Sequence, residues 1–289
     1  MEVCDKRAYA KINLSLDVVG RLENGYHQVR MIMQTVDLCD LMHFEKTDGA
    51  IEITCDNEEL SVGEDNLIYR AALLMKERFA LTGGLRVRLE KRIPMAAGMA
   101  GGSSDAASTL MAMNELYELG LSEKELREIG VKLGADVPYC IMGGTALSEG
   151  IGEILTRIAP MPECVLLVAK PEINVSTKYV YEQIDSKEIL DHPDVDGMQR
   201  AIENGDVSEM AGLLGNVLET VTVEKYPIVS QIKDLMTEGG AMGSLMSGSG
   251  PSVFGMFRKE EDARAAGEKI RAMGLAKQVF VTAPVNARA

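Results

Sequence analysis

The most informative segment of this chain is Pro94-Met95-Ala96-Ala97-Gly98-Met99-Ala100-Gly101-Gly102-Ser103-Ser104-Asp105. Its three glycines and three alanines leave the backbone N–H groups open to a bound anion. The spacing of apolar residues that follows predicts a helix over 104–119, with Ser103, Ser104 or Asp105 as its cap. The positive end of that helix would face the same anion. The segment therefore predicts a phosphate cradle suited to a triphosphate, although close packing of a buried helix would also explain its small residues.

This segment matches neither of two common nucleotide-binding motifs, the P-loop and the dinucleotide-binding loop. No Lys-Ser or Lys-Thr pair follows the glycines, and their spacing differs from the dinucleotide-binding fingerprint. Another phosphate-binding family is required.

The segment resembles the second motif of the GHMP kinases, Pro-x-x-x-Gly-Leu-Gly-Ser-Ser, with Met99 in place of the leucine and extra small residues before the serines. This resemblance implies an ATP-dependent small-molecule kinase with a two-domain α+β fold. Its N-terminal domain (1–160) would be ribosomal protein S5 domain 2-like and its C-terminal domain (161–289) ferredoxin-like. The resemblance implies ATP binding by Pro94, Ala96, Ala97, Gly98, Met99, Ala100, Gly101, Gly102, Ser103, Ser104, Gly248 and Gly250.

Further segments extend the resemblance over nearly the whole chain. They are Ala10-Lys11-Ile12-Asn13-Leu14-Ser15-Leu16, Gly25-Tyr26-His27, and the stretches 133–138, 216–219 and 246–254. Within the family they resemble the members that phosphorylate the 2-hydroxyl of a cytidine diphosphate-linked methylerythritol in the non-mevalonate isoprenoid pathway. The alternatives are a GHMP kinase of the homoserine or mevalonate type and a non-catalytic nucleotide-binding protein on the same fold.

Two charged residues stand alone in apolar surroundings. Asp136 lies between Ala135 and Val137, and Lys11 is the only charge between Arg7 and Asp17. A turn aspartate and a solvated strand lysine would explain them without any chemistry. The resemblance implies that Asp136 is the general base for the acceptor hydroxyl and that Lys11 is its charge partner.

Three further residues are candidates for substrate recognition. Tyr26 can stack on a cytosine ring and His27 can bond its polar edge, although a β-turn at Glu23-Asn24-Gly25 also explains them. The resemblance implies that they do bind the base and that Asn13 contacts the erythritol part. We expect Asn216 and Glu219 to be architectural. Magnesium is expected with ATP, and Glu149 is a weak candidate for its ligand.

Composition limits the function classes. A chain of 289 residues predicts two domains, and its net charge of −14 argues against a nucleic-acid partner. The five scattered cysteines argue against a disulfide framework or a zinc site. No apolar run is long enough to predict a membrane span, and the N-terminal residues do not resemble a targeting peptide. We therefore expect a cytoplasmic enzyme, monomeric or homodimeric, with a small-molecule substrate. His43 and His192 have no partners by spacing.

Strands and helices alternate along the chain. The predicted strands cover 8–19, 31–38, 41–46, 51–55, 85–91, 165–170, 252–257 and 278–282. The predicted helices cover 66–79, 104–119, 122–134, 207–218, 226–238 and 260–273, with a surface loop at 184–197.

Overall fold

The computed structural model describes residues 2–23, 25–187, 189 and 191–286, and the predicted turn residue Asn24 lies outside them. The chain forms two compact units. Unit 1 holds residues 1–10, 38–95 and 100–142, and unit 2 holds 11–37, 96–99 and 143–289. Strands β1 (Val3–Arg21) and β2 (His27–Thr47) each supply residues to both units. The compact units thus differ from a simple cut at residue 160, and the division into domains 1–160 and 161–289 stays a prediction.

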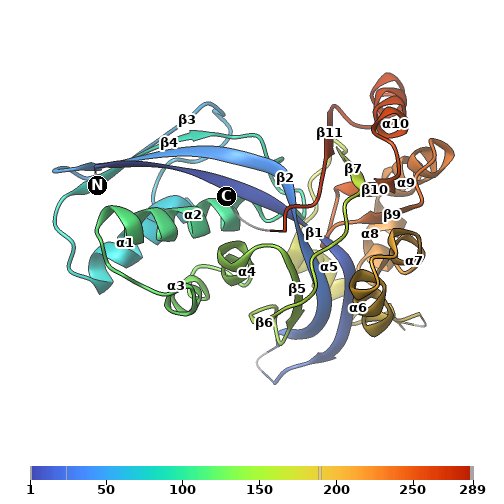
Figure 1. Ribbon diagram of the computed structural model, residues 1–289, viewed down its shortest axis with the longest axis horizontal. Coiled ribbons are helices and arrows are strands. Elements are labelled where there is room, and N and C mark those ends of the chain that lie inside the picture. Colours follow the sequence, from blue (N-terminus) through green and yellow to red (C-terminus); the bar gives the residue numbers. More distant parts are fainter. Residues whose placement is uncertain (1, 24, 188, 190, 287–289) are drawn as a thin grey trace. The chain divides into compact units, whose positions relative to one another are not determined.

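Unit 1 pairs a sheet with helices. Strand β4 (Gly84–Glu90) is antiparallel to the second half of β2 and parallel to β3 (Ile51–Cys55). Helix α1 (Leu67–Arg78) packs against α2 (Gly101–Leu116), which also contacts α3 (Glu123–Gly130) and α4 (Val137–Met142) (Figure 1). Phe44, Ile68, Val87 and Ala106 are fully or almost fully buried in its core.

Unit 2 contains a four-stranded antiparallel sheet among its described residues, in the order β11-β7-β10-β9. Its strands are β7 (Val165–Lys170), β9 (Gly243–Met246), β10 (Val253–Phe257) and β11 (Gln278–Thr282). Helices α9 (Ile228–Glu238) and α10 (Glu260–Ala272) pack on this sheet. The order 4-1-3-2 with a helix before β9 and another after β10 is ferredoxin-like, as expected.

Shorter elements complete unit 2. Strand β5 (Thr145–Glu149) pairs with β2 and with β6 (Ile154–Arg157), and β8 (Gly215–Asn216) runs parallel to β1 at Ser15 and Leu16. The remaining helices are α5 (Thr177–Ile184), α6 (Val195–Glu203), α7 (Val207–Gly212) and α8 (Glu219–Lys225).

Local chemistry accounts for most helix starts. Asn66 caps α1 by accepting a hydrogen bond from the Ile68 N–H, and Ser122 with Glu125 forms the predicted capping box of α3. Helix α2 differs, because its N-cap is Ala100, in a left-handed conformation and with no side-chain cap. The predicted caps at 103–105 are therefore wrong, since these residues lie inside the helix.

Several predicted boundaries also change. The strands predicted at 31–38 and 41–46 are one continuous strand, β2, and α3 ends at Gly130 rather than at Gly134. The helix predicted over 207–218 ends at Gly212, because the chain turns there to pair Gly215 and Asn216 with β1. In the predicted loop 184–197, α6 already begins at Val195, and positions 188 and 190 lie outside the described residues.

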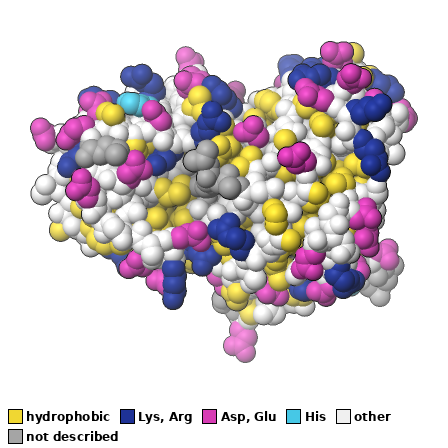
Figure 2. All heavy atoms as spheres, viewed as in Figure 1, with side chains coloured by type: hydrophobic (Ala, Val, Ile, Leu, Met, Phe, Trp, Pro, Cys, Tyr) yellow, Lys and Arg dark blue, Asp and Glu magenta, His cyan; other side chains and the backbone are white. Residues whose placement is uncertain are grey.

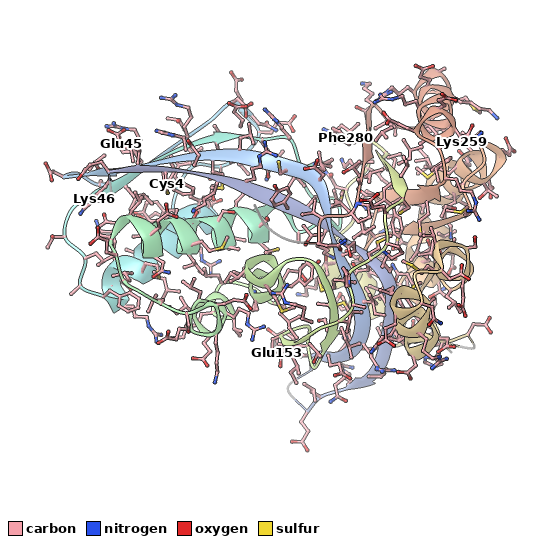
Figure 3. All side chains as sticks on the ribbon, in the orientation of Figure 1. Cys4, Glu45, Lys46, Glu153, Lys259 and Phe280 are labelled. Atoms are coloured by element: carbon pink, nitrogen blue, oxygen red, sulfur yellow. The ribbon has the colours of Figure 1, made fainter. Side chains whose placement is uncertain are left out.

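Acidic and basic side chains are interspersed on the face shown in Figure 2. On β2, Glu45 bonds Arg86 while the next residue, Lys46, lies over the Tyr117 ring (Figure 3). No described helix is long and apolar enough to cross a membrane. The five cysteines all lie among the described residues and are free, and burial raises the pKa of the Cys164 thiol to about 12.

Candidate active site

The backbone of the predicted cradle alternates in handedness. The φ angles of Ala96, Gly98 and Ala100 are +49°, +72° and +57°, and the residues between them are not left-handed. Alternation of this kind turns successive N–H groups into one concave surface that binds anions. Two of the three positions are alanines, for which a left-handed φ costs about 1 kcal/mol or more. The cradle thus keeps a strained backbone whose shape suits phosphate.

The hydrogen bonds of the cradle leave its N–H groups available. The carbonyl of Ala97 accepts from Ser252 N–H, that of Gly98 from the Ser247 hydroxyl, and that of Met99 from Lys11 N–H at 3.2 Å. No backbone acceptor for the N–H groups of 96–102 is found among the described residues. Carbonyls bonded to protein and amides left open are what a triphosphate site requires.

Predicted residues from distant parts of the sequence meet in unit 2. A Cβ atom placed on Gly98 would lie 2.2 Å from the Ser247 carbonyl oxygen, so only glycine permits this approach. A Cβ on Gly248 would lie 3.1 Å from the Gly98 carbonyl oxygen and 3.5 Å from Lys11 Nζ. The loop of residues 246–251, the late glycine loop, therefore contacts both the cradle and the predicted catalytic lysine. Gly250, with φ of +83°, turns the same loop.

Asn216 and Glu219 hold this late loop in place. The Asn216 amide donates to the carbonyls of Met246 and Gly248, both at 2.8 Å. Glu219 accepts from the Met246 N–H at 2.6 Å and pairs with Lys233. The expected architectural role of both residues is thus observed, as support for the loop beside Lys11.

Lys11 and Asn13 form a buried polar pair on β1. Lys11 is 5% exposed and Asn13 is fully buried, so the solvated-lysine alternative is wrong. Lys11 Nζ donates to Asn13 Oδ1 at 2.7 Å, and Asn13 Nδ2 lies 3.2 Å from the Met31 sulfur. No carboxylate pairs with Lys11 among the described residues, so the structure does not show the expected pairing of Lys11 with Asp136. The buried ammonium is available to an anionic substrate or transition state.

Asp136 lies in unit 1, in the turn before α4, and is half-buried. Its carbonyl accepts from the Cys140 N–H. A Cβ on the nearby Gly134 would lie 3.9 Å from the Ser103 hydroxyl oxygen, so the turn lies beside the first turn of α2. The hydroxyl of Ser104, which follows Ser103 in the chain, donates a hydrogen bond to the Tyr9 carbonyl oxygen at 2.7 Å. Asp136 thus borders the helix that begins at the cradle.

A buried ionic triad that the sequence did not predict lies within unit 1, next to the residues that lead into Pro94. Lys91 Nζ bonds the carboxylates of Asp40 and Asp105, and none of the three side chains is more than 4% exposed. Asp40 also accepts from the N–H groups of Arg92 and Ile93, immediately before Pro94. The triad connects the entry of the cradle to α2. No sequence signal marks it, because its members are far apart in the chain.

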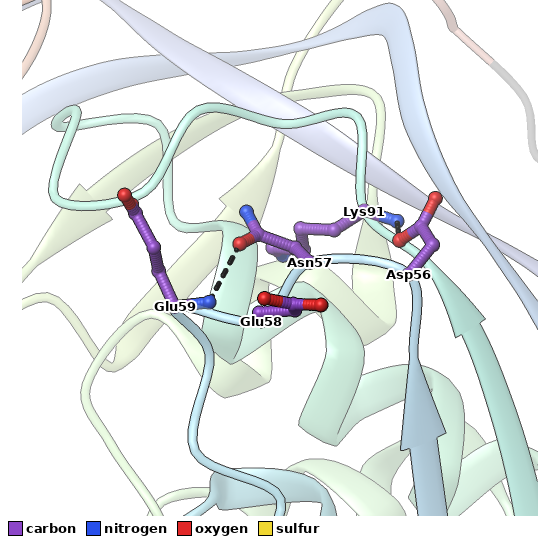
Figure 4. A pocket seen from close by; sticks show the side chains of 5 residues that line it. All are labelled: Asp56, Asn57, Glu58, Glu59 and Lys91. Atoms are coloured by element: carbon purple, nitrogen blue, oxygen red, sulfur yellow. Dashed lines mark hydrogen bonds between the residues drawn. The ribbon is translucent and has the colours of Figure 1, made fainter.

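An acidic pocket adjoins the triad but does not suit phosphate. It has a volume of about 450 Å³ and is lined by Asp56, Asn57, Glu58, Glu59 and Lys91 (Figure 4). Asp56 accepts from the Lys91 backbone N–H at 2.8 Å, while the Lys91 ammonium is bonded to Asp40 and Asp105. The carboxylates of this pocket would repel a triphosphate.

The predicted base-recognition residues lie in unit 2 with partners that the sequence did not reveal. Tyr26 is 60% exposed. His27 Nε2 lies 2.5 Å from Asp185 Oδ1, and its ring is 5.1 Å from that of Tyr181, centroid to centroid. Tyr26 thus presents an exposed ring, while the adjacent His27 is mostly buried beside Tyr181. An exposed aromatic ring suits a stacked pyrimidine.

Other candidates have ordinary explanations. Glu149 lies 3.6 Å from Arg30, which also bonds Asp196, and the described residues contain no group of three His, Cys, Asp or Glu that could hold a metal. The weak metal candidate therefore gains no further support. The expectation that His43 and His192 lack partners is wrong, because His43 bonds Asp5 and His192 bonds Asp17 at 2.8 Å.

Comparison with known proteins assigns the family. Residues 66–144 match the model of the GHMP kinases N terminal domain, and 198–275 match that of the GHMP kinases C terminal domain. The chain is 52% identical, over 98% of both chains, to "4-diphosphocytidyl-2-C-methyl-D-erythritol kinase" of Lachnospira eligens. It is 48% identical to the protein of the same name from Lachnoclostridium phytofermentans, over 98% of this chain and 97% of the other.

A solved structure agrees with these relatives. The "Crystal structure of 4-(cytidine 5'-diphospho)-2C-methyl-D-erythritol kinase" superimposes with a TM-score of 0.85 at 32% identity, covering 98% of this chain and 100% of the other. Both matched family models lie in the expected order along the sequence, and the cradle occupies the first of them. This chain belongs to the GHMP kinase family.

Proposed function

We propose that this chain transfers the γ-phosphoryl group of ATP to the 2-hydroxyl of 4-diphosphocytidyl-2-C-methyl-D-erythritol. The observation that carries the proposal is the meeting of Lys11, Asn13, Gly98 and Gly248 in unit 2, a buried cation beside open backbone amides. The names of the relatives support this choice of acceptor.

Each part of the proposed site has a physical task. The amides of the cradle hold the phosphates of ATP, and the first turn of α2 adds the positive end of a helix. Asp136 removes the proton of the acceptor hydroxyl as its oxygen attacks the γ-phosphorus. Lys11 stabilises the negative charge that develops on the transferring group. Phosphoryl transfer depends mainly on such positioning and charge stabilisation.

The acceptor is recognised at its two ends. Asn13, bonded to Lys11, contacts the erythritol part near the reacting hydroxyl. Tyr26 stacks on the cytosine ring, and His27 bonds its polar edge. Such recognition supports a cytidine-linked acceptor over homoserine or mevalonate, which offer no ring to stack.

Magnesium completes the proposal as a companion of ATP. Mg²⁺ is held in kinases by one or two carboxylates together with substrate phosphates, and it neutralises charge on the phosphates. We assign no protein ligand for it. The proposed partners are small molecules alone, with no nucleic acid and no membrane, in a cytoplasmic monomer or homodimer.

The decisive experiment offers the purified protein ATP and magnesium with each of three acceptors: the cytidine diphosphate-linked methylerythritol, homoserine and mevalonate. We expect a new phosphate monoester in the ³¹P NMR spectrum with the first acceptor alone, in equal amount to the ADP formed. Asp136→Asn protein, prepared identically, controls for contaminating kinases. Turnover of homoserine or mevalonate at the higher rate would select another GHMP kinase activity. ATP binding without transfer to any acceptor would select the non-catalytic alternative.

A further inference from the structure

Asp185 is placed where it costs helix stability. It is the C-cap residue of α5, at the end of a helix where the backbone dipole disfavours a negative charge. Its carboxylate instead reaches across 158 residues of sequence to His27, with Oδ1 2.5 Å from Nε2. The other oxygen, Oδ2, lies 2.9 Å from an Arg21 guanidinium nitrogen. Asp185 therefore forms an ion pair with Arg21 and a hydrogen bond with His27 at the same time.

This contact determines which His27 nitrogen carries a proton. A carboxylate accepts hydrogen bonds and cannot donate them, so the neutral imidazole must carry its proton on Nε2. The other nitrogen, Nδ1, then has a lone pair, and no partner for it is found among the described residues. The His27 side chain is 10% exposed and its ring lies beside Tyr181, so the ring has little freedom to flip.

We propose that Asp185, held by Arg21, is a positioning residue that presents His27 Nδ1 as a hydrogen-bond acceptor and thereby selects cytosine over uracil. The inference rests on the proposed function, in which His27 meets the base. Cytosine carries an amino group at C4, which donates to Nδ1. Uracil carries a carbonyl oxygen at the same position, so two lone pairs would face each other. A site built to receive a donor discriminates strongly against a ligand that lacks it.

The test measures the affinity of cytidine 5′-diphosphate and uridine 5′-diphosphate for the full chain by calorimetry at pH 8. We expect the wild-type protein to prefer the cytidine nucleotide by about tenfold or more. Asp185→Ala should lose most of this preference, because nothing then fixes the proton on Nε2, and the tautomer with its proton on Nδ1 cannot accept from the C4 amino group. Asp185→Asn should retain more of it, since its amide oxygen still accepts from Nε2–H.

Glu182→Ala is the matched control, because it removes an exposed carboxylate from the same helix. Glu182 pairs only with Lys178 among the residues shown to contact it, and its loss should leave the preference unchanged. A second readout is the ¹⁵N spectrum of histidine-labelled protein, with His27 assigned from its absence in His27→Gln. Wild-type and Glu182→Ala proteins should show a lone-pair nitrogen at Nδ1 of His27, whereas Asp185→Ala should show a mixture of both tautomers.

The outcomes separate the inference from the function it rests on. If the cytidine nucleotide leaves the His27 resonances of the wild-type protein unchanged, the proposed acceptor site itself is wrong. If the wild-type protein prefers cytidine through His27 but Asp185→Ala keeps both the preference and the His27 spectrum, the site stands and the role of Asp185 is overturned.

Discussion

The ammonium of Lys91 lies 2.7 Å from the Asp105 carboxylate and also bonds Asp40, so one buried cation faces two buried carboxylates. Burial, with Asp40 nearby and despite Lys91, raises the pKa of Asp105 from 3.8 to about 8. Asp40 also accepts two backbone N–H bonds. Because the pKa of Asp105 lies above 7, we assign a proton to Asp105 at neutral pH.

This assignment predicts how stability changes with pH. Because the pKa of Asp105 is higher in the folded than in the unfolded state, the folded state binds its proton more tightly. That contribution to stability is complete below about pH 4 and is lost as the pH rises through about 8. Asp105→Asn is permanently neutral, so its thermal midpoint, measured by calorimetry from pH 5 to 9, should fall less than that of the wild-type protein.

Asp40→Asn provides the contrast for this prediction. Removing the charged partner leaves the buried Lys91 poorly compensated, so we expect destabilisation of about 3 kcal/mol or more at every pH. Identical pH profiles for the wild-type and Asp105→Asn proteins would contradict the assignment of the proton to Asp105.

Glycine substitutions in the cradle should differ sharply in effect from one outside it. Gly98→Ala places a Cβ 2.2 Å from the Ser247 carbonyl oxygen at a φ of +72°, and Gly101→Val crowds Lys91 Nζ, 3.1 Å from the new Cβ. A Cβ on Gly212, outside the cradle, would meet nothing within 4 Å, so Gly212→Ala is the control. We expect the first two changes to raise the KM for ATP about tenfold or more, and the control to change it little. Equal KM values for all three variants would place the triphosphate elsewhere.

Asp136→Asn should abolish turnover while ATP affinity stays nearly unchanged. The amide has the shape of the carboxylate but cannot take the proton of the acceptor hydroxyl. Steady-state kinetics should show a fall in kcat of about a hundredfold or more, and equilibrium binding should show ATP bound as in the wild-type protein. A near-normal kcat would remove Asp136 from the role of base.

Tyr26→Ala and His27→Ala should affect the acceptor and spare ATP. Loss of stacking forfeits roughly 1–3 kcal/mol, and loss of the histidine leaves a polar group of the base unpaired at a similar cost. Both variants should raise the KM for the cytidine substrate about tenfold or more. If the KM for ATP rises and that of the acceptor does not, these residues belong to the adenine side.

The late glycine loop should depend on Asn216 more than on the charge of Glu219. Asn216→Ala removes both hydrogen bonds to the carbonyls of Met246 and Gly248, so Gly248 is no longer held beside Lys11. Glu219→Gln keeps an oxygen that accepts from the Met246 N–H. We expect a lower kcat and a higher KM for ATP in Asn216→Ala, and a much smaller change in Glu219→Gln. A larger loss in Glu219→Gln would show that the charge pair with Lys233, and not the Asn216 bonds, holds the loop.

Local features of this protein could be predicted from the sequence because they depend on neighbours along the chain. Ser122 and Glu125 are three residues apart and form the predicted capping box, and the apolar run after Cys164 forms the buried strand β7. The cradle stays a prediction, which rests on a run of small residues that would let the backbone approach an anion. The predicted caps of α2 are wrong, because the helix already begins at Gly101. The Ser104 hydroxyl, inside the helix, donates to the Tyr9 carbonyl, a partner remote in sequence.

The sequence by itself was enough to recognise the family and to predict the cradle and the candidate residues, because motifs and local propensities depend on residues close together in the chain. Only the tertiary structure decided which residues support them. Lys91 is 51 residues from Asp40, and His27 is 158 residues from Asp185. No periodicity links positions so far apart. Their pairing follows from burial, since a charge removed from water must be met by a partner that the folded chain brings to it.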